Sequence, residues 1–278
     1  ESSGFSVPEL PLSVELGELS VPHITFGEGV FGLAAEISAG GRLSLAGGAL
    51  DASLQIKRLD GPGGDFTFAA KYANETQVLD LDLALAEPQN GVIANLLGIE
   101  GRPPISLTLK GNGPISTLDL ALTMDAASQR VLAGTASLRQ GDDGMRFSAD
   151  VGGPIAAIIP ARFRSFFGAD TRLKTAGTVK TGGGLRLDTL TLDSAALALR
   201  ASLETAADNF LQRLDLHASI DDPQQEKTLL PIAGADATVE QATVDLSFGE
   251  AASENWTGSV RVTDLSTPTF GSKLVDVK

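Results

Sequence analysis

The chain has 278 residues, of which 42% are hydrophobic and 20% are charged, so it can bury a sizeable core and is not a disordered chain. Its net charge of −14 argues against nucleic acid as a partner, because phosphate backbones are bound by clusters of Lys and Arg. The sequence contains no cysteine, which excludes disulfides, and no run of about 18 apolar residues that could span a membrane as a helix.

From the N-terminus, apolar and polar residues alternate in short stretches that are separated by turn residues. This pattern predicts half-buried strands, because successive side chains on a strand point to opposite faces. We expect a first strand that Pro22 closes, and a glycine-rich turn at 61–64. The strands expected in this part of the chain cover 12–20, 30–37, 42–46, 50–59, 66–70 and 78–85.

The alternation of apolar and polar residues is clearest over 79–88. Its leucines at alternate positions share one face, Asp80 and Asp82 share the other, and Pro88 ends the strand because proline has no N–H to donate. Similar strands run into Pro154 and Pro223, so the three prolines are 66 and 69 residues apart.

New strands are expected at 105–109, 171–175 and 237–241, again 66 residues apart. We interpret this spacing as an internal repeat of four antiparallel strands and one short helix. The predicted sub-repeats cover approximately 41–99, 100–168, 169–234 and 235–278, the last of them incomplete.

A short helix is expected after each of the three prolines. The candidates cover 89–98, 155–167 and 224–230, and Pro160 should kink or break the second. Further strands are expected over 105–110, 118–124, 131–138, 145–151, 172–180, 185–192, 197–203, 211–220, 238–248, 256–265 and 273–277. We interpret 111–114 and 182–184 as hairpin turns, because neither continues as a nucleotide-binding motif ahead of a helix.

Little in the sequence indicates catalysis or metal binding. His23 and His217 are the only histidines, and they lie far apart without cysteines or carboxylates at metal-ligand spacing. Asp80 and Asp82 belong to no calcium-binding loop, and we expect them on a solvated outer face. The sequence predicts no enzyme and no cofactor.

The predicted fold is all-β, an elongated and curled antiparallel sheet of repeated four-strand units with short intervening helices. Its apolar faces must be covered, because burying one leucine side chain contributes roughly 1.5 to 3 kcal/mol. The sheet could fold over as a filled sandwich, or it could curl into a U-shaped trough that holds an apolar ligand. The aliphatic character of the faces suits hydrocarbon chains, but composition leaves both arrangements open.

Several segments of the sequence resemble those of a known protein family. The segments 79–88, 91–98 and 101–109 resemble the repeats of the TamB translocation and assembly module subunits, in the AsmA-like group, and 153–160 with 166–168 is similar in kind. The resemblance extends from about residue 10 to residue 277 and rests on the general residue pattern of the repeats. It includes neither the membrane anchor of the family nor a clear C-terminal domain of the kind that meets a barrel partner.

The resemblance implies a periplasmic, groove-forming segment of a protein anchored in the inner membrane of a Gram-negative envelope. It implies phospholipids as partners, transport toward the outer membrane, and a link to outer-membrane protein assembly through a β-barrel partner of the TamA type. The segment 155–167 could then gate the trough, with Arg162 and Arg164 meeting headgroups, although a role in covering the sheet is favoured. Two rivals stay open: a scaffold that pairs its sheet edge with nascent barrel strands, and a filled β-repeat that serves as a spacer or adhesive stalk.

On this hypothesis, acyl chains would lie against inward-facing apolar side chains. The candidate lining residues are Leu54, Ile56, Phe66, Phe68, Leu79, Leu81, Leu83, Leu85, Leu107, Leu109, Leu118, Leu120, Leu122, Leu197, Leu199, Leu214, Leu216 and Ile220.

Overall fold

The computed structural model describes residues 7, 13–232, 236–249 and 255–278. The fold class is the predicted one, since the chain is all-β and its strands form a curled, open antiparallel sheet with short intervening helices. The chain divides into two compact units, Glu1–Gln140 and Gly141–Lys278, which we call unit 1 and unit 2.

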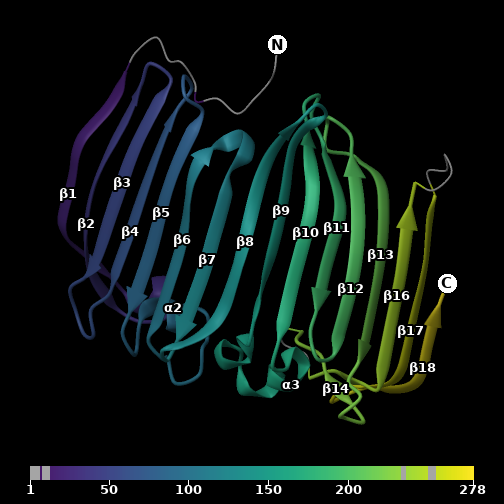
Figure 1. Cartoon of the computed structure of the whole chain (residues 1–278). Coiled ribbons are helices and arrows are strands. Elements are labelled where there is room, and N and C mark those ends of the chain that lie inside the picture. The colour runs from purple at the N-terminus through teal and green to yellow at the C-terminus, as the bar shows by residue number, and fades with distance from the viewer. Residues whose placement is uncertain (1–6, 8–12, 233–235, 250–254) are drawn as a thin grey trace. The chain divides into compact units, whose positions relative to one another are not determined.

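Unit 1 is built from strands that pair with their neighbours in sequence order (Figure 1). Two short helices interrupt this order, one after the first strand and one after the fifth. The elements are β1 (Val14–Phe26), α1 (Glu28–Phe31), β2 (Ala35–Ala46), β3 (Ala49–Arg58), β4 (Asp65–Ala73), β5 (Val78–Glu87), α2 (Val92–Leu96), β6 (Ile105–Pro114), the 3-10 helix η1 (Ile115–Thr117), β7 (Asp119–Ala126) and β8 (Gln129–Gly141).

Unit 2 follows the same plan, with β13 pairing directly with β16. Its elements are β9 (Gly144–Gly153), the 3-10 helices η2 (Ile155–Ile158) and η3 (Ala161–Phe163), α3 (Arg164–Phe167), β10 (Thr171–Lys180), β11 (Leu185–Asp193), β12 (Leu197–Thr205), β13 (Leu211–Asp221), β14 (Thr228–Leu229), β15 (Thr238–Val239), β16 (Gln241–Phe248), β17 (Trp256–Ser266) and β18 (Gly271–Val277). The helical turns follow β9, which comes four strands after β5 in the chain.

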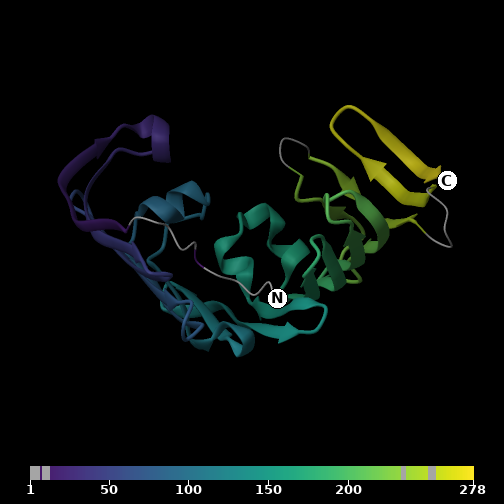
Figure 2. The ribbon, with the colours of Figure 1, turned by 90° about the horizontal axis from the view of Figure 1, so that it is seen from above.

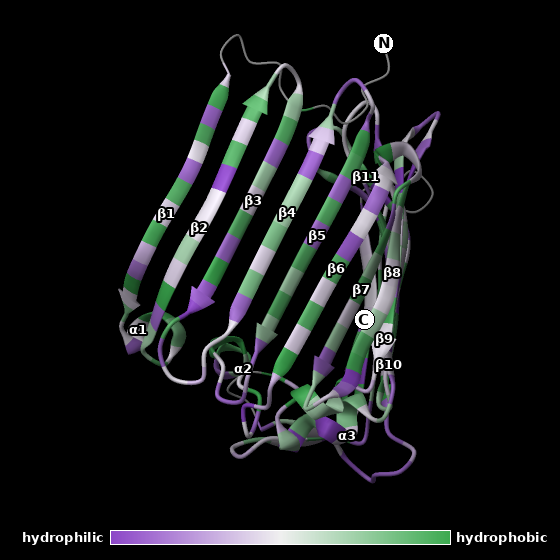
Figure 3. Ribbon diagram, turned by 60° about the vertical axis from the view of Figure 1, so that its left-hand side comes forward, coloured by the Kyte–Doolittle hydropathy of each residue, from purple (hydrophilic) through white to green (hydrophobic). Residues whose placement is uncertain are grey.

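The register of the strands places apolar side chains opposite one another in rows that cross the sheet. In unit 1, one row runs through Leu54, Phe68, Leu83, Leu109 and Leu122, on five successive strands. The alternation of apolar and polar residues is visible as bands along β1 to β6 (Figure 3). Each unit therefore has an apolar face and a polar face.

The helices of unit 1 lie on the apolar side of its sheet. Glu87 shares the face of Leu83 and Leu85, and its carboxylate accepts hydrogen bonds from the backbone N–H groups of Val92 and Ile93, at 2.8 Å each. Figure 2 shows the sheet of unit 1 curving around the side on which α1 and α2 lie, so the apolar face is the concave one. Glu87 also explains why α2 begins at Val92, because a carboxylate at a helix N-terminus satisfies N–H groups that have no partner within the helix.

The helix predicted over 155–167 is broken as expected. Pro160 separates η2 from η3, and only Arg164–Phe167 is α-helical. The helix predicted over 89–98 is shorter than expected, at Val92–Leu96.

The helix predicted over 224–230 is wrong. Thr228 and Leu229 instead form β14, which pairs with β15. The carboxylate of Asp222 accepts hydrogen bonds from the backbone N–H of Gln224, at 3.0 Å, and from the side chain of Gln225, at 2.7 Å. These local bonds hold the segment in a turn rather than a helix.

Three predictions near the strand ends of unit 1 are also wrong. Pro22 does not close the first strand, since β1 continues to Phe26 and shifts register between Val21 and Ile24. Proline is tolerated at this position because β1 is an edge strand, and a residue at a bulge does not have to donate its N–H to the neighbouring strand. Of the two strands expected over 30–37 and 42–46, residues 35–37 and 42–46 are strand, but they belong to the single strand β2, and α1 occupies the start of the first. The turn expected at 111–114 is part of β6. The turn at 182–184 is confirmed.

Most of the buried apolar side chains of unit 1 lie near the two ends of its strands. At one end, Val7, Tyr72 and Ile115 form a cluster, with Leu45, Leu50, Leu79 and Leu138 packed against it. At the other end, the buried residues include Ala94 and Ile99 near α2, Ile105 and Ala126. The leucines between the two ends are only half-buried. Among the described residues, no helix is long and apolar enough to cross a membrane.

Candidate functional site

The apolar face of unit 1 carries the predicted lining residues of that unit. Leu54 and Ile56 lie opposite Phe68 and Phe66, and β5 contributes its alternating leucines to the same face. The predicted residues on this face are Leu54, Ile56, Phe66, Phe68, Leu79, Leu81, Leu83, Leu85, Leu107, Leu109, Leu120 and Leu122. All of them are half-buried, so an apolar ligand that covered them would remove further apolar area from water.

Leu118 differs from the other predicted lining residues. It precedes β7 and is only 1% exposed. Its carbonyl accepts a hydrogen bond from the N–H of Leu138 at 2.8 Å. A side chain that is already buried offers no area to a ligand, so Leu118 supports the sheet and does not line an open surface.

Unit 2 presents a second apolar face. Leu197 lies opposite Ile220, and Leu199 opposite Ala218. Leu214 and Leu216 continue into Phe248 and Leu246 on β16. The five predicted residues of this unit, Leu197, Leu199, Leu214, Leu216 and Ile220, therefore share one face, and each is half-buried. Their role in binding stays a prediction.

The sequence interpretation missed about as many lining positions as it named. The register adds Leu16, Leu19, Leu43, Leu45, Leu50 and Leu132 to the face of unit 1, and Phe147, Val151, Leu187, Leu190, Leu192, Leu203, Val244, Leu246, Val260 and Val262 to that of unit 2. The same two-residue alternation identifies most of them. Bulges such as the one between Leu187 and Leu190 hide the rest, because an extra residue changes which face the alternation predicts.

The opposite face of each unit carries cross-strand ion pairs. In unit 1, Lys110 Nζ lies 2.8 Å from Asp82 Oδ2. In unit 2, Arg172 binds Asp150 through two hydrogen bonds of 2.6 and 2.7 Å, which lower the pKa of that carboxyl. The rows of the apolar faces contain no such charges between the strand ends, so an occupant of those rows must itself be uncharged over most of its length.

His217 lies on the polar face of unit 2. Its Nδ1 is 2.6 Å from Asp245 Oδ1, and the side chains of both residues are more than half exposed. The hydrogen bond from His217 lowers the pKa of Asp245. No group of three or more metal-ligating side chains occurs in the part of the chain that the structure describes.

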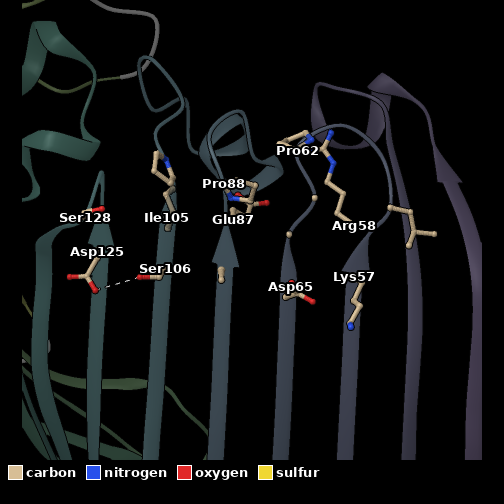
Figure 4. A pocket seen from close by; sticks show the side chains of 15 residues that line it. Lys57, Arg58, Pro62, Asp65, Glu87, Pro88, Ile105, Ser106, Asp125 and Ser128 are labelled. Atoms are coloured by element: carbon tan, nitrogen blue, oxygen red, sulfur yellow. Dashed lines mark hydrogen bonds between the residues drawn. The ribbon is translucent and has the colours of Figure 1, made fainter.

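A hollow of about 640 Å³ opens at the helical end of unit 1 (Figure 4). Lys57, Asp65, Ser106 and Asp125 line it on successive strands, with the small side chain of Ala86 between Asp65 and Ser106. Ser106 Oγ donates a hydrogen bond to Asp125 at 3.4 Å, and Arg130 pairs with the same carboxylate at 2.6 Å. The Asp125 carboxylate is thus bound within the protein, and Lys57 and Asp65 lie opposite each other on neighbouring strands.

The segment 155–167 covers part of unit 2. Phe166 is 3% exposed, and its carbonyl accepts a hydrogen bond from Ser194 Oγ at 2.9 Å. Arg162 lies 3.1 Å from Asp236 and against the ring of Phe163. These contacts fasten the segment to the β11–β12 connection and to the stretch after β14, which favours the covering role.

The exposed area of the chain is large for its mass. The chain exposes 15,750 Å². A compact protein of 28.7 kDa exposes about 11,300 Å², and two compact bodies of half that mass would together expose about 13,600 Å². The half-buried apolar rows on the described strands of each unit contribute to this excess.

Comparison of the chain with protein-family models, with characterised proteins and with solved structures gave no significant match.

Proposed function

We propose that this chain is a segment of a bridge-like lipid transport protein, which shields phospholipid acyl chains on its apolar faces between the inner and outer membranes of a Gram-negative envelope. The observation that carries the proposal is the set of apolar rows that cross successive strands of unit 1 without a charged side chain between the strand ends, and whose leucines the described residues leave only half-buried. No covalent chemistry is required. A ligand held by non-directional apolar contact can slide along the rows, because no polar group fixes its position.

The energetics favour an acyl chain over a polar ligand. Removing apolar area from water contributes roughly 25 cal/mol per Å², so an acyl chain gains along its whole length as it lies across the half-buried leucines. A sugar or a nucleotide would lose hydrogen bonds to water on the same surface, since the rows consist almost entirely of aliphatic and aromatic side chains. The wet headgroup would then stay at the strand ends.

The proposal is tested first by mass spectrometry of an organic extract of the purified, detergent-free chain. A soluble globular protein of similar size from the same host is the control. We expect phospholipid to be enriched over this control, whereas a clean extract from well-folded protein would contradict the proposal.

A matched pair of substitutions on β5 sharpens the test. Leu83→Asp places a charge in the middle of the apolar face and should reduce bound lipid by roughly tenfold, because burying a carboxylate under an acyl chain is unfavourable. Ala84→Asp places the same charge one residue away on the polar face, opposite Thr67 and Thr108, and should leave binding unchanged. Equal loss in both variants, or in neither, would count against binding on the apolar face. In the full-length protein, Leu83→Arg or Leu81→Asp should block lipid transfer.

A second candidate function is a scaffold for outer-membrane β-barrel insertion through a partner of the TamA type. Among the described strands, β1 pairs only with β2 and β18 only with β17, so each has one unpaired edge. An edge of this kind can pair with a nascent strand. A proline in the middle of β18, such as Leu274→Pro, should impair that function more than lipid binding.

A further inference from the structure

One residue outside the sheet occupies an end of the unit 1 apolar face. Val7 is 8% exposed and packs with Tyr72 and Ile115. The partly buried residues against this cluster include Leu45, Leu50 and Leu79. Leu45, Leu50, Tyr72 and Leu79 are successive cross-strand neighbours, so together they form the outermost row of the apolar face on β2 to β5, which we call the end row.

The backbone of Val7 is held by a single side chain. Asn74 Oδ1 accepts a hydrogen bond from the Val7 N–H at 2.9 Å, and Asn74 Nδ2 donates one to the Val7 carbonyl at 2.9 Å. The two residues are 67 positions apart in the chain. The amide thus supplies the same donor and acceptor that a neighbouring strand would supply, although Val7 belongs to no strand.

The position of the Asn74 side chain is itself determined by the turn at the end of β4. The N–H of Asn74 donates to the carbonyl of Gly48 at 2.9 Å, a bond that does not depend on the side chain. Gly48 has a φ of +71°, and a Cβ at this position would lie 2.7 Å from Asn74 Nδ2. Glycine at 48 therefore leaves the space in which the Asn74 amide turns toward Val7.

Val7 buries part of the end row that a ligand would otherwise cover. Tyr72 is 3% exposed, whereas the leucines at the centre of the same face are half-buried. Burial raises the pKa of the Tyr72 phenol above its ordinary value.

We propose that Val7, clamped by Asn74, is a reversible cap that competes with an acyl chain for the end row of the unit 1 apolar face. The inference rests on the proposed function, because it names an internal regulator of the same surface. The occupant that Val7 excludes is a hydrocarbon chain, since the end row offers only apolar groups and one tyrosine. Opening of the cap would expose Tyr72 and lengthen the apolar surface available to a ligand.

The test uses substitutions at positions 74 and 7 in the whole chain. Asn74→Ala removes both hydrogen bonds to Val7, and Asn74→Asp keeps an acceptor for the Val7 N–H but loses the donor. Val7→Ile preserves an apolar side chain at the cap. The matched control is Asn112→Ala, an exposed asparagine on the polar face of β6 opposite Asp80.

The first readout needs no ligand. Tyr72 is the only tyrosine of the chain, so a spectrophotometric titration reports on it alone. We expect the pKa of Tyr72 to fall toward its ordinary value in the order wild type, Asn74→Asp, Asn74→Ala, and to stay raised in Val7→Ile and Asn112→Ala. An unchanged Tyr72 titration in folded Asn74→Ala would overturn the cap.

The second readout is fluorescence titration with cis-parinaric acid, a fluorescent fatty acid. We expect Asn74→Ala to bind roughly tenfold more tightly than wild type, because affinity scales with the fraction of molecules whose site is open. Equal binding in wild type and Asn74→Ala would overturn the competition while leaving the proposed function intact. If no variant binds the fatty acid although the pKa of Tyr72 shifts as expected, the proposed function would be overturned. The assignment of a hydrocarbon chain as the ligand that the cap excludes would fall with it. If Asn74→Ala fails to fold, Val7→Asp serves as the opening variant.

Discussion

At the scale of single residues, one polar contact that ties distant parts of unit 1 together is centred on Asp60. Its carboxylate accepts two hydrogen bonds of 3.0 Å from the Arg58 guanidinium and one of 2.8 Å from the backbone N–H of Glu36. Arg58 also donates to the carbonyl of Asn90 at 3.3 Å. The pair therefore links the start of β2, the end of β3 and the connection before α2, and these hydrogen bonds lower the pKa of Asp60 to about 2.

We expect Asp60→Asn to lower the free energy of unfolding by about 2 kcal/mol, because the Arg58 side chain, only 9% exposed, loses its charged partner. The contribution of Asp60 should be complete above its unfolded pKa, near 3.8, and should disappear as the pH falls through about 2. Urea unfolding at neutral and acidic pH measures both effects. If Asp60→Asn lowers the free energy of unfolding equally at both pH values, the charge of Asp60 is not responsible for the destabilisation.

At the scale of elements, close approach of neighbouring backbones explains glycines within the strands. Gly177 lies in β10 opposite Phe147 and Leu187. A Cβ at this position would lie 2.4 Å from the carbonyl oxygen of Arg186 and 2.8 Å from Cζ of Phe147. The ring of Phe147 thus covers the glycine, next to a register shift between Ala176 and Gly177 that bends the strand pair.

Substitution of Gly177 should therefore be costly although the residue lies in regular structure. We expect Gly177→Ala to destabilise unit 2 by about 1 to 3 kcal/mol, because the neighbouring backbone must move. The control is Gly182→Ala, at a turn where a new Cβ would have no atom within 4 Å. Chemical denaturation of the two variants distinguishes crowding from a general effect of replacing glycine, which would affect both.

At the scale of the whole chain, the polar faces make stability depend on pH. Hydrogen bonds from Arg, Lys or His side chains lower the pKa of a series of carboxyls in both units. These are Asp60, Asp125, Asp143, Asp150, Glu204, Asp245, Asp264 and Asp276. Since most of them are exposed, each pair contributes little alone, but all of the shifts have the same sign.

We expect the urea midpoint of unfolding to be highest above the unfolded carboxyl pKa values and to fall as the pH drops below about 4. The direction follows because the unfolded chain binds protons at a higher pH than the folded chain does. A midpoint that rises on acidification would contradict the assignment. High salt at neutral pH should lower the midpoint only slightly, because exposed pairs are already weak.

The sequence predicts the fold better in some stretches of the chain than in others. The alternation over 78–85 predicts β5 and both of its faces, because strand geometry alone decides where alternate side chains point. Pro160 likewise predicts the break between η2 and η3. Local patterns fail where distant partners decide the structure: Gly40 and Gly41 stay in β2 because they pair with Gln55 and Leu54 on β3.

The sequence by itself therefore determined the strand class, the polar and apolar faces, and the absence of disulfides. Only the tertiary structure decided which residues are already buried, as it did for Leu118, and which segment covers the end row, as it did for Val7. The physical reason is that periodicity records the side of a strand on which a side chain lies. Whether that side faces another part of the chain or water depends on contacts between residues far apart in sequence, such as Val7 and Asn74.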